Sequence, residues 1–204
     1  PAVMILTSSF GGGHWAANFA TGVLLALENL EIDGQHIDLL REVDYLSTSS
    51  GGGFAAGLYI SSLYDHLQAN NNDRAGYSLA KSLAANKARL RQNLRRDYAG
   101  TIFEGMISPI VYGNIDGGDF LEKKLNHFIL GAAYREGGTS ITMGNVFREK
   151  GNPLPVSLPY WIPNATIYEN GQRFPFTPGI LKRYEVTGCT HQLKSLEIRN
   201  NPYR

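Results

Sequence analysis

Two glycine-rich turns carry the residues of this sequence that are best suited to chemistry. One turn consists of residues 11–13, and the other is formed by Ser50 and the three glycines that follow it. A serine acts as a nucleophile when it is exposed on a tight turn, has a base to take its proton and faces N–H groups that stabilise the developing negative charge. Small neighbours permit such a turn where a strand runs into a helix. Ser50 is therefore the candidate nucleophile.

Ser50 stands in a run of hydroxyl residues, and two of its neighbours compete with it. Ser47 and Ser49 carry the same hydroxyl group, and Thr48 occupies the position where the common elbow motif has glycine. Ser50 is preferred because it is central to the motif and because the glycines after it open a predicted helix. The positive N-terminal end of that helix favours a negative charge nearby.

The first turn is a candidate oxyanion hole. Its backbone N–H groups can line an anion-binding nest, and they belong to Gly11, Gly12 and Gly13. Taken alone, such a loop is equally a phosphate cradle or a flexible connection. It is not a P-loop, since no Gly-Lys-Ser/Thr follows, and it lacks the spacing of a dinucleotide fingerprint, so only the glycines support a nucleotide-binding domain. Together with the Ser50 turn, it predicts an oxyanion hole that faces a nucleophile.

The elements around the two turns are expected to alternate between strand and helix. Apolar and periodic patterns predict strands at residues 2–6 and 43–46 and helices at residues 14–30 and 54–67. This order favours an α/β fold with a parallel sheet covered by helices, in which ligands bind at the carboxyl ends of the strands. Both glycine turns are expected to lie there.

Several finer features are also expected. The helix at residues 14–30 has apolar residues at spacings of three and four, which predicts one apolar face: Phe19, Val23, Leu24, Leu27 and Leu30. Residues 32–35 are interpreted as a polar connection containing Gly34. Later in the chain we expect a helix at residues 120–130, a strand at 161–168, a turn at Asn170-Gly171 and a further extended segment at 173–176.

The composition is that of a soluble globular domain. The chain has 204 residues, of which 43% are hydrophobic and 18% charged, and its net charge of +1 does not call for nucleic acid. The single cysteine, Cys189, excludes an internal disulfide and a cysteine-based zinc cluster. No metal or cofactor is expected. His14 lies beside a glycine turn, and the other four histidines show no metal-ligand spacing: His36, His66, His127 and His191. The sequence does not decide between a membrane-associated, an exported and a cytoplasmic location.

A basic helical segment interrupts the predicted α/β pattern. We expect one domain over residues 1–204, with a helical basic insertion at residues 69–100. Leucines at helical spacing mark one face of this segment, and lysines and arginines occupy the others. The segment is interpreted either as a solvated surface helix or as a patch, over residues 79–96, that contacts an anionic membrane surface.

Three stretches of the chain resemble patatin-like phospholipases and acyl hydrolases. Residues 10–16 and 22–24 resemble the opening loop and helix of that family, residues 43–56 its nucleophile elbow, and residues 159–166 its strand of the Asn-Ala-Thr type. The resemblance implies a three-layer α/β/α fold with a mainly parallel central sheet. It also implies hydrolysis of lipid acyl esters in two acyl-transfer steps, with Ser50 as nucleophile and the Gly11 to Gly13 turn as oxyanion site.

The sequence departs from the family pattern at two places. Trp15 stands where the family usually has arginine after the glycine loop. The family also uses a Ser-Asp dyad, with the aspartate in an Asp-Gly turn after the Asn-Ala-Thr strand, and no such turn follows that strand before Arg204. Asp116 begins an Asp-Gly-Gly turn, but it precedes that strand and leads into a predicted helix, which Asp119 would cap. Asp116 is therefore the less favoured candidate.

Two expectations follow from the missing aspartate. One is that the catalytic aspartate lies outside this chain, on a longer protein or a second fragment, and that the 204 residues alone are almost inactive. The alternative is a catalytically inactive patatin-like module that binds an anionic ligand or partner with its glycine turn. Trp15 and the missing aspartate both suit this alternative.

Overall fold

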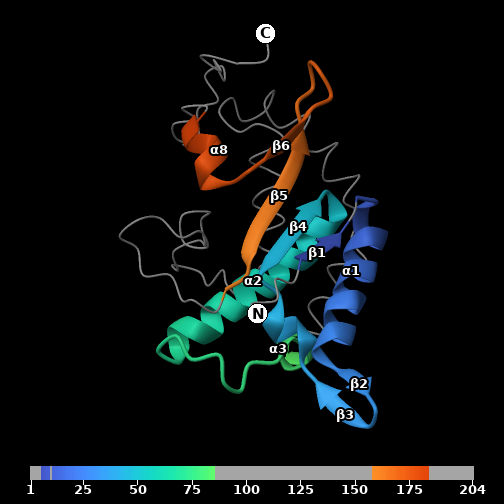
Figure 1. Ribbon diagram of the computed structural model, residues 1–204, viewed down its shortest axis with the longest axis vertical. Coiled ribbons are helices and arrows are strands. Elements are labelled where there is room, and N and C mark those ends of the chain that lie inside the picture. Colours follow the sequence, from blue (N-terminus) through green and yellow to red (C-terminus); the bar gives the residue numbers. More distant parts are fainter. Residues whose placement is uncertain (1–5, 10, 86–157, 184–204) are drawn as a thin grey trace, which may run out of the picture. The chain divides into compact units, whose positions relative to one another are not determined.

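The computed structural model describes residues 6–9, 11–85 and 158–183 (Figure 1). In chain order, its elements are β1 (Leu6–Ser9), α1 (Gly13–Glu28), β2 (Leu30–Ile32), β3 (Gln35–Ile37), the 3-10 helix η1 (Leu39–Glu42), β4 (Tyr45–Ser49), α2 (Gly51–Ala69), α3 (Leu79–Ala85), β5 (Tyr160–Thr166), β6 (Arg173–Pro175) and α8 (Pro178–Arg183). The fold is mixed α/β, as the alternating pattern predicted. The helix expected at 120–130 and the turn beginning at Asp116 lie outside the described residues.

The chain divides into two compact units. One comprises residues 1–56 and 142–204, and the other comprises residues 57–141. The dividing point falls within α2, so the strands and residues 51–56 of α2 belong to the first unit, and the rest of α2 belongs to the second. The expected single domain with an insertion at residues 69–100 stays a prediction.

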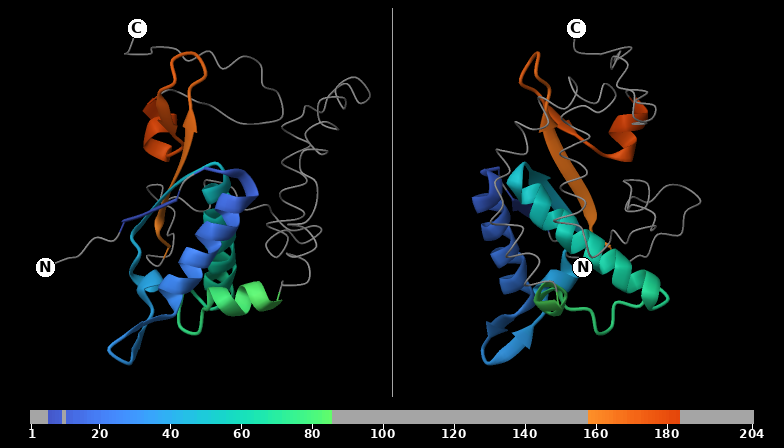
Figure 2. Two further views of the ribbon diagram at one scale, coloured as in Figure 1. Left: turned by 90° about the vertical axis from the view of Figure 1, so that its right-hand side faces the viewer. Right: turned by 180° about the vertical axis from the view of Figure 1, so that it is seen from behind.

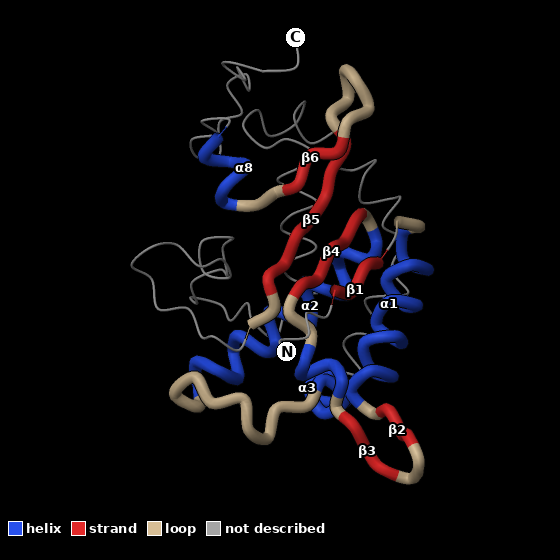
Figure 3. The backbone as a smooth tube through the Cα atoms, viewed as in Figure 1, coloured by secondary structure: helices blue, strands red, loops and turns tan. Residues whose placement is uncertain are grey.

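A four-stranded mixed sheet forms the centre of the first unit. Its strand order is β1-β4-β5-β6 (Figure 3). β1 is parallel to β4, β4 is parallel to β5, and β5 is antiparallel to β6. In both views of Figure 2, β5 runs past the end of β4 and turns back into β6. The turn between β5 and β6 includes Gly171 at φ 69°, as the Asn170-Gly171 pair predicted. Because β1 and β4 are parallel neighbours, the segments that leave their carboxyl ends emerge at the same edge.

Both strands that lead to the glycine turns run further than their apolar patterns predicted. The predicted ends were residues 6 and 46, whereas β1 ends at Ser9 and β4 ends at Ser49. A polar side chain can lie in a buried strand when another element supplies its hydrogen-bond partner. Thr48 is such a case: it is only 1% exposed, and its hydroxyl accepts a hydrogen bond from Trp161 Nε1. The end of β4 therefore depends on a residue that is distant in sequence.

The buried face of α1 differs from the predicted one. Ala17, Ala20 and Leu24 are buried, whereas Phe19 is 76% exposed and Val23 is also exposed. The prediction that Phe19 and Val23 share the buried face is therefore wrong for these two residues. Alanine side chains at spacings of three and four let α1 pack closely, and one of its neighbours is η1. Hydrophobicity alone assigned the larger apolar residues to the buried face, which alanines occupy instead.

A β-hairpin replaces the polar connection expected at residues 32–35. β2 and β3 are antiparallel, with Ile32 opposite Gln35. The two residues between them, Asp33 and Gly34, have φ values of 52° and 73°. Positive φ at both central positions is the requirement of a type I′ turn, for which Asp-Gly is a favoured pair. The Asp33-Gly34 pair is thus a local hairpin signal, which the periodicity of apolar residues does not reveal.

Within the second unit, α2 and the segment after it share a buried apolar and polar cluster. Tyr59, Leu63 and Leu67 of α2 are fully buried, together with Leu79 at the start of α3. Arg74 Nη2 donates a 2.6 Å hydrogen bond to the Tyr59 hydroxyl, which fixes the connection between the helices. In the described part of the basic segment, Leu79 is buried and Lys81 is exposed, as expected of an amphipathic helix. Among the described helices, none combines the length and apolarity needed to cross a bilayer.

Candidate functional site

The two glycine-rich turns lie against each other in the first unit. A Cβ atom placed on Gly11 would lie 3.1 Å from the Cβ of Ser50 and 3.6 Å from its Oγ. The backbone of the first turn therefore borders the Ser50 side chain directly. Both turns were expected at the carboxyl ends of their strands, and the parallel pairing of β1 and β4 places them there.

Gly51 shows how tightly the two turns are packed. A Cβ atom on Gly51 would overlap the carbonyl oxygen of Gly13 and would lie 2.9 Å from its carbonyl carbon. It would also lie 3.2 Å from the Cβ of Ala16 in α1. Because the obstructing atoms belong to backbone, no side-chain rearrangement can make room for a methyl group. The contact between the turns therefore requires glycine at position 51.

Ser50 has an unusual backbone conformation for a serine. It lies between the last residue of β4 and the first residue of α2, with φ at 48°, and it is exposed. The other described non-glycine residues with positive φ are aspartate or asparagine, which tolerate this region: Asp33, Asn71 and Asn72. For a serine, the left-handed conformation costs about 1–2 kcal/mol, and such strain persists only where the surrounding structure imposes it.

The first turn consists of glycines, so it offers a ligand backbone groups rather than side chains. Gly12 is the N-cap of α1, with φ at 140°, and it provides no side-chain cap; Gly13 follows with φ at 60°. No acidic residue stands in the first turn of α1 or of α2. The first N–H groups of a helix have no partner within the helix, and the helix end carries a partial positive charge. The arrangement is suited to stabilising an anion beside Ser50.

The structure distinguishes Ser50 from its two competitors. Ser47 and Ser49 lie within β4 and are half-buried. The Ser47 Oγ lies 3.1 Å from Asn164 Nδ2 and accepts a hydrogen bond from it. Ser50 alone of the three occupies the strand-to-helix turn and is exposed. This is the geometry that a nucleophile elbow requires.

Two residues of β5 form hydrogen bonds with the end of β4. No role was predicted for either of them from the sequence. Trp161 Nε1 donates to the Thr48 hydroxyl at 2.9 Å, and Asn164 Nδ2 donates to the Thr48 carbonyl at 2.9 Å. Both residues lie in the stretch that resembles the Asn-Ala-Thr strand. That resemblance was the one sequence feature that pointed to them, because nothing in their local pattern relates them to residue 48.

A general base is the component that the described part of the site does not contain. Among residues 6–9, 11–85 and 158–183, no hydrogen bond joins the Ser50 hydroxyl to a carboxylate or an imidazole. The side chain of His14 and the whole of Asp116 lie outside what the structure describes. Trp15, the residue after His14, is 76% exposed in the first turn of α1. The described residues also hold no group of three His, Cys, Asp or Glu side chains suited to a metal ion.

Compared with protein-family models, curated proteins and solved structures, the chain has no significant match. The resemblance to patatin-like enzymes therefore rests on the three stretches of sequence quoted above.

Proposed function

We propose that the intact protein is a serine-dependent acyl hydrolase of the patatin-like type, with Ser50 as nucleophile and the turn of Gly11, Gly12 and Gly13 as oxyanion site. One observation carries the proposal. A serine is held at φ 48° between a parallel strand and a helix, exposed to solvent and directly against a glycine turn. Local turn chemistry does not favour this conformation for serine, and an exposed nucleophile benefits from it.

The proposed reaction proceeds in two acyl-transfer steps. Ser50 Oγ attacks the acyl carbonyl carbon while its proton passes to a base, and the carbonyl oxygen becomes an oxyanion beside the glycine turn. Collapse of this intermediate breaks the ester bond, and the base returns the proton to the leaving alcohol. Water then attacks the acyl-serine ester and releases the acid and the free hydroxyl of Ser50. The base is proposed to be an aspartate outside the described residues, as in the Ser-Asp dyad of the family that the chain resembles.

The proposed fold and substrate class rest partly on the same resemblance. The parallel strands β1, β4 and β5 support a patatin-like α/β/α architecture with a mainly parallel sheet. Lipid acyl esters are the proposed substrates. A contact between residues 79–96 and an anionic membrane stays part of the proposal, supported by the exposed Lys81 on the described portion, α3.

Ester hydrolysis by the full-length protein tests the proposal. A short p-nitrophenyl ester is the substrate, and Ser50→Ala is compared with Ser49→Ala, which removes a hydroxyl from the adjacent residue. We expect Ser50→Ala to lower the rate by at least about 10³-fold and Ser49→Ala to leave most of the activity. An Asp116→Asn variant shows in the same assay whether the less favoured aspartate is the base. Equal rates for wild type and Ser50→Ala would contradict the proposal.

The second candidate is a non-catalytic module that binds an anion at the glycine turn. The exposed Trp15 in place of arginine favours it. It predicts no ester hydrolysis by the full-length protein and unchanged anion binding in Ser50→Ala. The hydrolase proposal requires the opposite result in the first measurement.

A further inference from the structure

The side-chain amide of Asn164 forms hydrogen bonds both within β5 and with the end of β4. Its Nδ2 lies 2.9 Å from the Thr48 carbonyl oxygen, 2.9 Å from the Ile162 carbonyl oxygen and 3.1 Å from the Ser47 Oγ. In the parallel register, Asn164 is the partner of Ser49, the residue directly before Ser50. One side chain of β5 therefore contacts β4 immediately before the candidate nucleophile.

The orientation of this amide is fixed by its partners. Carbonyl oxygens can only accept hydrogen bonds, so the two carbonyls require the NH₂ end of Asn164 on their side. The Oδ1 atom then points away, and among the described residues it is buried without a hydrogen-bond partner. Burial of an unpaired acceptor lowers stability, so this orientation of the amide needs an explanation. The contacts to β4 are that explanation.

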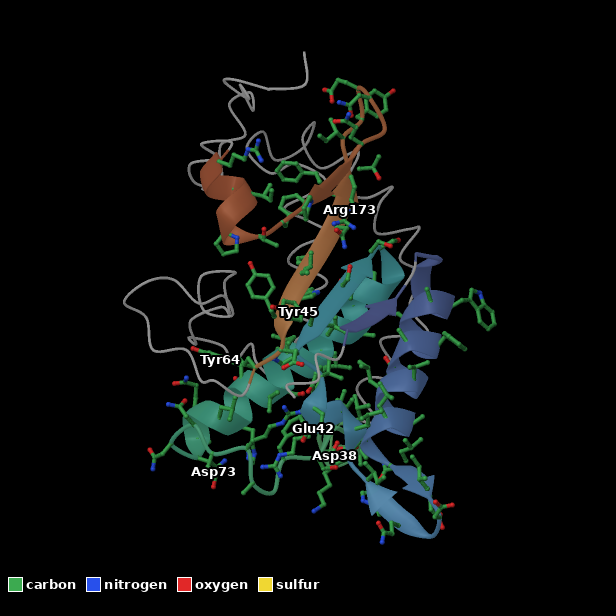
Figure 4. The ribbon with its side chains drawn as sticks, in the orientation of Figure 1. Asp38, Glu42, Tyr45, Tyr64, Asp73 and Arg173 are labelled. Carbon is green, nitrogen blue, oxygen red and sulfur yellow. The ribbon has the colours of Figure 1, made fainter. Side chains whose placement is uncertain are left out.

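Trp161 holds the same β4 residue from a second direction. Its Nε1 donates to the Thr48 Oγ1 at 2.9 Å, so Thr48 is bound through both its carbonyl and its hydroxyl. At the opposite end of the strand pair lies Tyr45 (Figure 4). Its ring packs against that of Tyr160, with the centroids 5.9 Å apart. The β4–β5 pair is thus fixed along its length, and most closely at the end that leads to Ser50.

We propose that Asn164, together with Trp161, is a positioning residue for the Ser50 nucleophile. This inference rests on the function proposed above. The left-handed conformation of Ser50 requires restraint on both sides. On the helix side, Gly51 packs on Gly13, and Gly53 N donates to the Ser50 carbonyl at 2.9 Å. On the strand side, the restraint comes from the contacts of Asn164 and Trp161 with Thr48.

Release of the strand side would let Ser50 relax to negative φ. Its Cβ lies only 3.1 Å from the position of a Cβ on Gly11, so a change of φ would move Oγ away from the glycine turn. A displacement of about 1 Å in a reacting group can cost on the order of 10²-fold in rate. The contacts of Asn164 and Trp161 therefore affect the reaction although neither residue touches the reacting atoms.

The test is the rate at which a fluorophosphonate modifies Ser50 in the full-length protein, measured below the melting temperature of each variant. Asn164→Ala removes all three contacts, and Trp161→Phe removes only the N–H that binds Thr48. Asn170→Ala is the matched control, because Asn170 lies in the same β5–β6 hairpin and its side chain forms hydrogen bonds with Gln172 rather than with β4. We expect Asn164→Ala to slow modification about 10- to 100-fold, Trp161→Phe to slow it less, and Asn170→Ala to leave it unchanged.

A kcat and KM comparison on a p-nitrophenyl ester separates positioning from a purely structural role. Positioning predicts a lower kcat with KM nearly unchanged in the folded variant, whereas a structural role lowers the melting temperature and leaves both constants unchanged. A folded Asn164→Ala protein that reacts at the wild-type rate would overturn the inference and leave the proposed function intact. If Asn164→Ala does not fold, a wild-type kcat in Trp161→Phe overturns it instead. Failure of the wild-type protein to react defeats the proposed function itself.

Discussion

Asp33 and Ser50 have nearly the same backbone conformation for different reasons. Their φ values are 52° and 48°. Asp33 is followed by Gly34 in the two-residue turn between β2 and β3, where a type I′ turn requires positive φ and aspartate tolerates it. Ser50 instead lies between a strand and a helix, beside Gly11, and is anchored through Thr48 by residues of β5. The first conformation follows from local sequence, whereas the second is imposed by tertiary contacts, which is where function is expected.

The largest change in stability is expected from Gly51→Ala, which disrupts the tertiary contact at the Ser50 turn. The added methyl group would overlap the Gly13 carbonyl, so the two turns must separate. We expect a loss of about 3 kcal/mol in the free energy of unfolding, the upper part of the range for overpacking. Gly22→Ala in α1 is the control, since its added Cβ meets no described residue within 4 Å apart from the chain next to it in the same helix, and it should add about 0.5–1 kcal/mol. Urea denaturation measures both, and equal stabilities would show that the turns are not in contact.

An intermediate effect is expected from Gly34→Ala in the hairpin. Gly34 has φ at 73° and open space around it, so the cost is one of backbone conformation alone. We expect a loss of about 1–2 kcal/mol and no change in the rate of phosphonate modification at Ser50. A changed rate would mean that the hairpin and the Ser50 turn are not independent.

The smallest change in stability is expected when Ser50 and Asp33 are each replaced by glycine. Ser50→Gly relieves about 1–2 kcal/mol of left-handed strain and adds an entropic cost of roughly 0.5–1 kcal/mol. A net gain of about 0.5–1 kcal/mol should therefore accompany complete loss of activity. Asp33→Gly adds the same entropic cost but relieves little strain, because aspartate tolerates the left-handed conformation, so it should lower stability by about 0.5–1 kcal/mol. Thermal unfolding compares the two, and a destabilised Ser50→Gly would show that Ser50 is not strained.

The two turns also differ in what the sequence could predict. The glycines and small residues around Ser50 predicted a strand-to-helix turn beside a glycine loop, and the structure places them so. The contacts of Trp161 and Asn164 with Thr48 could not be predicted from local pattern, because more than a hundred residues separate the partners.

The hairpin shows the opposite case, in which a local feature was present and was passed over. Asp33-Gly34 is a favoured hairpin pair, but each flanking strand has only three residues, too few to show alternation. Leu30, the first residue of β2, also fitted the helical spacing of the segment before it. In α1, the same spacing gave Phe19 a buried place that alanines occupy instead. Periodicity locates elements, and packing decides their ends and faces.

The most direct test of the central claim is to identify the residue that a fluorophosphonate modifies in the full-length protein. Peptide mapping by mass spectrometry distinguishes Ser50 from its neighbours Ser47 and Ser49. The left-handed, exposed Ser50 beside Gly11 predicts a single modification at Ser50, lost in Ser50→Ala and retained in Ser49→Ala. Modification at Ser47 or Ser49, or none in a folded full-length protein, would contradict the claim.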